Sequence, residues 1–386
     1  MKKQTRCIVR HEWRPDGTVA FPGSVPPIDP STAFHHLEGE AQPYPRYFNT
    51  GDQARVAQLI ADLEQAEAGL LFSSGMAAIT TTLRTLLPPG AHAVFLEGLY
   101  GGTQALVATE LAGWQVEHTL VKNDPGGFAE ALRPHTRVIY IESPTNPLMD
   151  IVDLAAIVSL ARQHGITTVI DNTFASPINQ NPIRHGIDVV LHSGTKYLGG
   201  HSDLSCGAVV STADRIDALR AKAKLYGGNL NALSVYLLDR SLKTMNLRVR
   251  QQTENAMQLA EFLHGHPLVK HVSYPGLPSH PAHAVACRQM DGFGAMLAFE
   301  VASQVEVPGF LRALRVVRPA LSLGGVESSL CVPATTSHRD VDDAVLATLG
   351  ITPRVIRLSV GAEAVEDLQA DLAQAMQVAS EALASS

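Results

Sequence analysis

The stretch that decides the predicted fold is TVIDNTFASPINQNPIRHGIDVVLHSGTK, residues 168–196. It holds two short apolar runs, 168–170 and 189–191, and polar residues follow each run directly. Continuous apolar runs, unlike alternating ones, indicate strands whose two faces are both covered. The polar residues include Asp171 after the first run and Lys196 shortly after the second. We therefore expect two buried strands with functional side chains at their carboxyl ends.

The same pattern continues on both sides of this stretch. Further strand-like runs alternate with helical stretches and lie at residues 70–72, 93–96, 115–121, 138–141 and 208–210. Strands that alternate with helices indicate β-α-β units and a mainly parallel sheet. After a long helical stretch over 230–263, strands expected near 269–274, 295–301 and 355–360 indicate a smaller α+β domain.

These patterns predict three parts: an arm over 1–48, a large α/β domain over 49–242 and a smaller C-terminal α+β domain over 243–386. Seven of the 23 prolines lie in the first 48 residues, where little periodicity is visible. Such a segment cannot build a core of its own, so it is either a frayed terminus or an arm laid over another surface. Tyr44 and Tyr47 beside Arg46 favour the arm.

Composition narrows the class of protein. The 386 residues carry a formal net charge of −7 and no cluster of five Lys or Arg, which argues against nucleic acid as a partner. No apolar run reaches the length of a membrane span. The N-terminal apolar run is too short for a signal peptide, and the four cysteines lie far apart. We expect buried thiols in a reducing compartment and a cytoplasmic protein. The histidines lack a matching set of ligands, so no metal site is predicted.

Ligands of open α/β sheets bind at the carboxyl ends of the strands. Polar side chains gather at several predicted strand ends: Ser73–Ser74–Gly75, Glu142–Ser143, Asp171–Asn172, His192–Ser193 and Lys196. A buried lysine with a lowered pKa can form a Schiff base with an aldehyde, as pyridoxal phosphate requires. That cofactor also needs a carboxylate at its pyridine nitrogen. From Asp171 and Lys196 alone, an ordinary salt bridge fits equally well.

A predicted anion site supports pyridoxal phosphate as the cofactor. Ser73–Ser74–Gly75–Met76 lies between a strand and a helix, where free backbone N–H groups favour a phosphate. Ser193 and Thr195 supply hydroxyl donors beside Lys196. A P-loop is excluded, because the residues around Lys196 lack its glycine spacing and its following Ser or Thr.

With these residues in view, the sequence resembles the Cys/Met-metabolism family of pyridoxal-phosphate enzymes, which includes cystathionine γ-synthases, cystathionine β- and γ-lyases and methionine γ-lyases. The matching segments occur in the family's order, at 44–46, 74–79, 99–103, 142–147, 171–177, 192–203, 322–328 and 357–361. The resemblance implies the type I, aspartate-aminotransferase-like fold, with a mainly parallel central sheet and a smaller C-terminal α+β domain.

The resemblance also implies a role for each matching residue. Lys196 would bind pyridoxal 5′-phosphate covalently and move protons, Asp171 would pair with the pyridinium nitrogen, and Tyr100 would stack on the ring and assist protonation. The other residues assigned to the cofactor are Gly75, Met76, Thr173, Ser193 and Thr195, with Tyr44 and Arg46 reaching it from a neighbouring subunit. Tyr44 would also act as an acid. The residues assigned to the substrate are Asn146, Ser322, Glu327 and Arg357. The shared site implies a homo-oligomer, and the family resemblance points to a dimer of dimers.

The expected activity is a carbon–sulfur lyase that acts on cystathionine or a cysteine derivative by β- or γ-elimination. A γ-synthase that works by γ-replacement on an activated homoserine ester is the alternative. A methionine γ-lyase is less favoured, because Gly102 stands where such enzymes have a cysteine. An aminotransferase and a non-catalytic binding module stay open. Three departures from the family predict a divergent distal pocket: Gln104–Ala105 in place of an arginine, Pro43 before Tyr44, and Asn49–Thr50 without proline.

Overall fold

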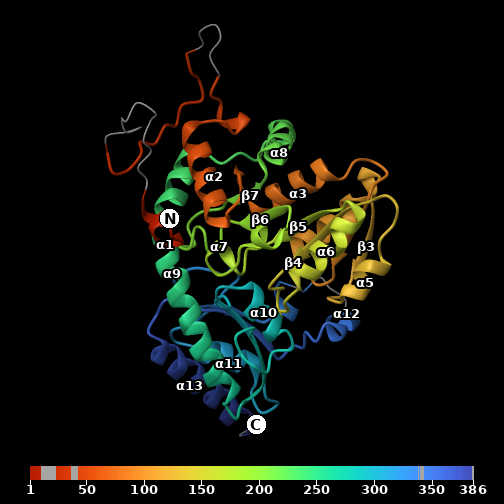
Figure 1. The fold of residues 1–386 in the computed structure, drawn as a ribbon. Helices are drawn as coiled ribbons and strands as arrows, with labels where there is room; N and C mark the ends of the chain where they lie inside the picture. Colours follow the sequence, from red (N-terminus) through yellow and green to blue (C-terminus); the bar gives the residue numbers. More distant parts are fainter. Residues whose placement is uncertain (10–22, 36–41, 338, 340–342, 385–386) are drawn as a thin grey trace.

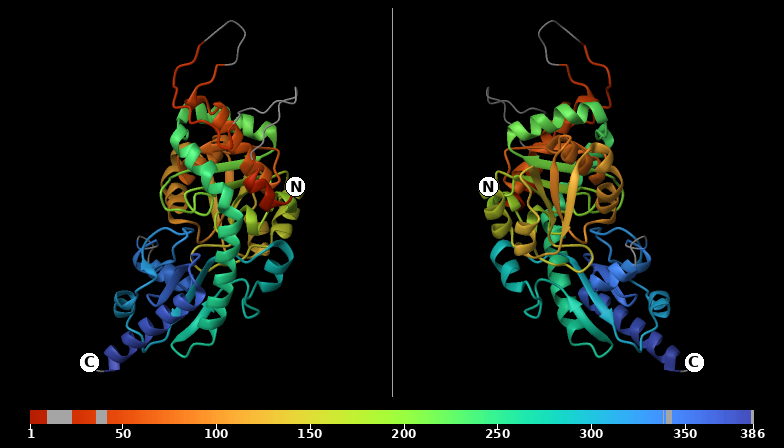
Figure 2. Two further views of the ribbon diagram at one scale, coloured as in Figure 1. Left: turned by 90° about the vertical axis from the view of Figure 1, so that its left-hand side faces the viewer. Right: turned by 90° about the vertical axis from the view of Figure 1, so that its right-hand side faces the viewer.

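The computed structural model describes residues 1–9, 23–35, 42–337, 339 and 343–384 (Figure 1). The rest of the predicted N-terminal arm, 10–22 and 36–41, lies outside the described residues. The chain forms two lobes, each built around one sheet, and a long helix runs along both (Figures 1 and 2).

The larger lobe contains a seven-stranded sheet in the order β1-β7-β6-β5-β4-β2-β3. Its strands are β1 (Ala68–Phe72), β2 (His92–Leu96), β3 (Glu117–Val121), β4 (Thr136–Glu142), β5 (Thr167–Asp171), β6 (Val189–Ser193) and β7 (Gly207–Ser211). Strands β2 to β6 pair in parallel, and β7 runs antiparallel to both of its neighbours. The central strands are buried along almost their whole length, as their continuous apolar runs predict.

Helices cover both faces of this sheet. They are α2 (Gly51–Glu64), α3 (Gly75–Leu86), α4 (Gly101–Glu110), α5 (Pro125–Glu130), α6 (Leu154–His164), α7 (Ser176–Asn179) and α8 (Ala213–Tyr226), with short 3₁₀ turns η1 (Pro45–Tyr47), η2 (Ala112–Trp114) and η3 (Pro182–His185). His192 of β6 contacts Glu64 at the end of α2. The next residue, Ser193, faces Gly75 at the start of α3. Because successive strand residues point to opposite faces, the end of α2 and the start of α3 lie on opposite sides of the sheet.

Local sequence explains where these helices begin and end. In α6, the Asp153 carboxylate accepts hydrogen bonds from the N–H groups of Ala155 and Ala156, as an N-cap does. Gly165 ends the helix with a φ of 65°, a conformation that glycine adopts without a side-chain penalty.

The smaller lobe is a five-stranded sheet in the order β10-β11-β12-β9-β8. Its strands are β8 (Val269–Ser273), β9 (Met296–Val301), β10 (Arg318–Pro319), β11 (Ser329–Cys331) and β12 (Val355–Ser359). Its helices are α10 (His283–Gln289), α11 (Val307–Ala313), α12 (Asp343–Thr348) and α13 (Val365–Ala384), with the 3₁₀ turn η4 (Pro333–Thr335). The predicted fold class, a mainly parallel central sheet with a smaller α+β domain, is confirmed.

Helix α9 (Ala232–His264) is continuous over 33 residues and runs from one lobe to the other (Figure 2). The predicted boundary between residues 242 and 243 therefore falls inside a helix. From its middle, Arg248 donates to the carbonyl of Tyr197 in the larger lobe at 3.1 Å. One turn further on, Gln252 donates to the carbonyl of Gly325 in the smaller lobe at 2.6 Å. The division into domains stays a prediction.

The start of the predicted arm packs against its own chain. Helix α1 (Lys3–Ile8), which the sequence analysis did not predict, lies against α9, and Cys7 is completely buried. Lys3 holds this helix in place by donating to the carbonyl of Ile178 at 3.1 Å. A single six-residue helix is too short to show periodicity. One expectation from the sequence is wrong: the four cysteines are not all buried, because Cys287 on α10 is exposed.

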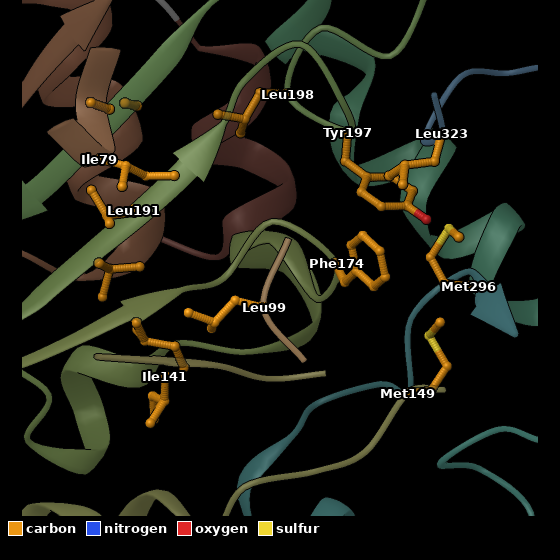
Figure 3. Packing of buried hydrophobic residues seen from close by; sticks show 14 of the residues in the cluster. Ile79, Leu99, Ile141, Met149, Phe174, Leu191, Tyr197, Leu198, Met296 and Leu323 are labelled. Atoms are coloured by element: carbon orange, nitrogen blue, oxygen red, sulfur yellow. The ribbon is translucent and has the colours of Figure 1, made fainter. Parts of the chain in front are cut away.

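Apolar side chains from both lobes form one continuous core. Figure 3 shows where the lobes meet: Phe174 and Tyr197 from the larger lobe lie near Leu323 and Met296 from the smaller lobe. This packing fixes the segments on either side of the cavity described below. No helix among the described residues has the length and apolarity needed to cross a bilayer.

Candidate active site

A cavity of about 690 Å³ lies at the carboxyl ends of the parallel strands, where the two lobes meet. Most of the predicted site residues line it: Gly75, Met76, Tyr100, Asn146, Asp171, Thr173, Ser193, Thr195, Lys196, Ser322 and Arg357. These residues come from both lobes and from distant parts of the chain. The structure therefore brings together what the sequence predicted strand by strand.

One end of the cavity can hold a phosphate. Ser74 caps helix α3, and its hydroxyl accepts a hydrogen bond from the Ala77 N–H at 3.1 Å. The N–H groups of Gly75 and Met76 lie in the first turn, where no intrahelical acceptor exists. A Cβ at residue 75 would come within 3.2 Å of Ser193 Oγ, so glycine keeps this space open. The arrangement is that of a helix N-terminus that binds an anion.

The buried carboxylate at the end of β5 is held by its neighbours. Thr173 donates to Asp171 Oδ1 from its backbone N–H at 3.0 Å and from its hydroxyl. The Thr173 hydroxyl in turn accepts from the Ser193 N–H at 2.8 Å, which joins β5 to β6. Burial raises the pKa of Asp171, and the two bonds from Thr173 oppose that rise. A positively charged ring nitrogen is the partner that favours the ionised form of this group.

A second buried acid, Glu142, lies directly across the β4–β5 register from Asp171. Its Oε2 accepts a hydrogen bond from the Tyr100 N–H at 2.9 Å and so places the start of helix α4. Burial, and then the charge of Asp171, raise the pKa of Glu142 well above its usual range. Of the two acids, Glu142 is the one for which burial and its neighbour favour the neutral form more strongly. Sequence reasoning noted Glu142 only as a strand end, and its role emerges only from the strand register.

Lys196 points into the cavity between the lobes. Its Nζ donates to Ser322 Oγ at 2.8 Å, and burial, with help from Arg357, lowers its pKa to about 8. Ser322 has a φ of 83°, in the left-handed region that side chains rarely adopt. A lysine of this kind carries a substantial fraction of neutral amine near physiological pH, which a nucleophile or base requires.

Arg357 on β12 faces the same space and is almost completely buried. Its Nη1 donates to Asn146 Oδ1 at 2.9 Å, and its Nη2 lies 3.5 Å from the Ser322 carbonyl. Both partners are neutral. A guanidinium held among neutral acceptors at a cavity wall is suited to bind a carboxylate through two parallel hydrogen bonds.

Comparison with known proteins agrees with this chemistry. The family model described as Cys/Met metabolism PLP-dependent enzyme matches residues 7–377. The chain belongs to this family. Its cofactor is pyridoxal 5′-phosphate, and it is an enzyme of the cystathionine lyase and synthase group.

Individual members of the Cys/Met family align over nearly the whole chain. The chain is 41% identical to the cystathionine gamma-lyase of Bacillus subtilis over 381 residues, which cover 98% of this chain and 100% of that protein. It is 40% identical to the cystathionine gamma-synthase of Mycobacterium leprae, with 94% of each chain covered. The solved cystathionine gamma-lyase of Lactobacillus plantarum, complexed with L-serine, superposes with a TM-score of 0.93 at 37% identity and covers 98% of this chain and 99% of its own.

The residues of this family member fit the cofactor. The cavity offers a lysine of lowered pKa for an aldehyde, a buried carboxylate for a pyridine nitrogen and a helix N-terminus for a phosphate. Gly102 fits the ring stack assigned to Tyr100, because a Cβ at 102 would lie 2.7 Å from Tyr100 Cε1. A side chain at 102 would require the Tyr100 ring or the Met76 side chain to shift.

Three predicted site residues of the Cys/Met family lie away from the cavity in this chain. Arg46 donates to the Lys224 carbonyl at 2.6 Å and lies over the Tyr44 ring, with 5.5 Å from its Cζ to the ring centroid. Glu327 has 60% of its side chain exposed and lies 3.7 Å from Arg318. Tyr44 and Arg46 are predicted to act in the site of a neighbouring subunit. These roles, and the role of Glu327, stay predictions.

Proposed function

We propose that this chain is a carbon–sulfur lyase that acts on cystathionine or a cysteine derivative by β- or γ-elimination. The observation that carries the proposal is the position of Lys196. Its amine, with a pKa lowered to about 8, lies in one cavity with the guanidinium of Arg357. A base and a carboxylate-binding group so placed suit an α-amino acid whose Cα proton is to be removed.

Pyridoxal phosphate, when bound, supplies an electron sink that stabilises negative charge at the substrate Cα. In this proposal Lys196, Asp171, Thr173 and the first turn of α3 hold it. Arg357, Asn146 and the Ser322 backbone orient the α-carboxylate. The Lys196 amine removes the Cα proton, and the Tyr100 hydroxyl, or that of Tyr44 from a neighbouring copy, donates a proton to the departing sulfur.

The wall of the cavity bears on the choice of substrate. Along α4, Ala105 and Ala108 face the cavity, and Ile79 and Leu321 add further apolar surface. Lys196 and the buried Arg357 are the cations among its described lining residues. Cystathionine carries a second carboxylate, for which the described part of the wall has neutral polar side chains, such as Gln104 and Thr336, but no second arginine. These contacts favour a cysteine derivative with a neutral substituent over cystathionine.

A γ-synthase is the second candidate, supported by the 40% identity to the Mycobacterium leprae enzyme over 94% of the chain. The test is a substrate panel on the purified holoenzyme: cystathionine, cysteine, homocysteine, methionine and S-methylcysteine, with 2-oxo acid, ammonia and thiol measured together. A lyase releases all three in equal amounts. An activated homoserine ester with cysteine, giving cystathionine without ammonia, would establish the synthase instead. Full turnover by Lys196→Ala would refute the mechanism.

A further inference from the structure

A buried polar cluster lies behind the cavity, on the opposite face of the large sheet. Its centre is Glu64, the last residue of α2, which is completely buried. One carboxylate oxygen, Oε1, lies 2.7 Å from His192 Nε2 and also accepts a hydrogen bond from Asn172 Nδ2 at 2.7 Å. The other oxygen accepts from Asn181 Nδ2 at 3.1 Å. Nothing in the mechanism above uses this cluster.

The cluster contacts the ends of β5 and β6, the two strands that carry the cofactor residues Asp171 and Ser193. Asn172 directly follows Asp171, and His192 directly precedes Ser193. Asp171 and Ser193 line the cavity, so their neighbours point to the other face of the sheet. Glu64 thus binds β5 and β6 from behind, at the level where the cavity side chains emerge in front.

Charge is the second property of the cluster. A buried carboxylate is costly unless it is paired, and His192 is the basic group that contacts Glu64 among the described residues. Other elements bring further groups close to the Glu64–His192 pair. Strand β7 places the apolar Ala208 opposite His192, and the segment after α7 contributes the neutral amide of Asn181. Strand β5 contributes the acid Asp171. A protonated His192 behind the sheet lowers the pKa of Asp171, against the effect of burial.

We propose that Glu64 and His192 are positioning residues of the cofactor site, which act through Asn172 and Asp171. Glu64 holds the ends of β5 and β6 together and keeps the His192 ring protonated. The charged ring in turn keeps the Asp171 carboxylate ionised toward the pyridine nitrogen. This inference rests on the assignment of Asp171 and Lys196 in the proposed function.

The test is Glu64→Gln in the full-length holoenzyme, since glutamine keeps the size of the side chain and removes its charge. Two quantities are measured: the dissociation constant for pyridoxal phosphate, and the absorbance of the bound cofactor as a function of pH. We expect the dissociation constant to rise about tenfold and the acid-side absorbance transition to move up by about one pH unit. The direction follows because Asp171, without the charge behind it, takes up a proton at higher pH.

The matched control is Asn181→Ala, which removes one hydrogen bond to Glu64 and leaves the charge. A purely structural cluster would lower thermal stability in both variants and shift the absorbance transition in neither. The proposal expects the shift in Glu64→Gln alone. An unshifted transition in folded Glu64→Gln overturns it.

A measurement on the unaltered protein covers the case in which Glu64→Gln does not fold. With ¹⁵N-labelled histidine, the His192 ring of the holoenzyme should show protons on both nitrogens at neutral pH. A neutral ring overturns the proposal. Failure of the proposed function looks different: there, Lys196→Ala retains turnover, whatever Glu64→Gln does.

Discussion

Replacement of Arg357 by lysine tests the carboxylate site most directly. The guanidinium offers parallel donors, Nη1 at 2.9 Å from Asn146 and Nη2 at 3.5 Å from the Ser322 carbonyl, and so can grip both oxygens of a carboxylate. A lysine ammonium keeps the charge and loses one of the two bonds. A hydrogen bond to a charged group contributes about 1.5–3 kcal/mol. Since about 1.4 kcal/mol is tenfold in affinity, KM should rise between about ten- and about a hundredfold.

The assay is 2-oxo acid release over a range of substrate concentrations, with kcat expected to change much less than KM. Arg357→Gln is the control, because it also removes the charge that helps to lower the pKa of Lys196. In that variant the recombination of apoenzyme with pyridoxal phosphate should require a higher pH, whereas Arg357→Lys should behave like the parent enzyme. An unchanged KM in Arg357→Lys would show that the substrate carboxylate binds elsewhere.

Four further predictions address other parts of the cavity. Glu142→Gln should retain most activity, because the raised pKa favours a neutral Glu142, and glutamine is neutral and keeps the acceptor for the Tyr100 N–H. Glu142→Ala should lose at least about tenfold in kcat as the Tyr100 N–H loses its acceptor, and equal losses in the two variants would contradict this assignment. Ala105→Arg should raise kcat/KM for cystathionine relative to S-methylcysteine about tenfold, and an unchanged ratio would show that residue 105 does not face the distal group. Gly75→Ala should weaken pyridoxal phosphate binding about tenfold in an equilibrium titration, and unaltered binding would place the phosphate elsewhere. Recombination of the parent apoenzyme with the cofactor should accelerate through about pH 8 as Lys196 loses its proton, and a rate that is flat from pH 6 to about pH 9 would contradict the lowered pKa.

Sequence reasoning located those features of this site that depend on strand ends. Asp171 and Lys196 could be found because each follows an unbroken apolar run, and the carboxyl ends of parallel strands share one edge. Arg357 and Ser322 come from the other lobe, and only the family resemblance linked them to Lys196. The structure places all four against one cavity.

What the sequence could not reveal depends on long-range register. Glu142 meets Asp171 only because β4 and β5 pair in the observed register. Glu64 and His192 are 128 positions apart, and neither lies in a pattern that distinguishes it from an ordinary helix end or strand residue. Helix α1 was missed because six residues are too few to show a 3.6-residue period.

The long helix α9 has a practical consequence for engineering. At about 1.5 Å per residue its 33 residues form a rod about 50 Å long, fixed to Tyr197 on one side and to Gly325 on the other. Helix α9 thus connects the lobe that carries Lys196 with the lobe that carries Arg357. A chimera that exchanges one lobe with that of a relative should be joined outside residues 232–264, because a graft within the rod would alter the spacing between the two groups.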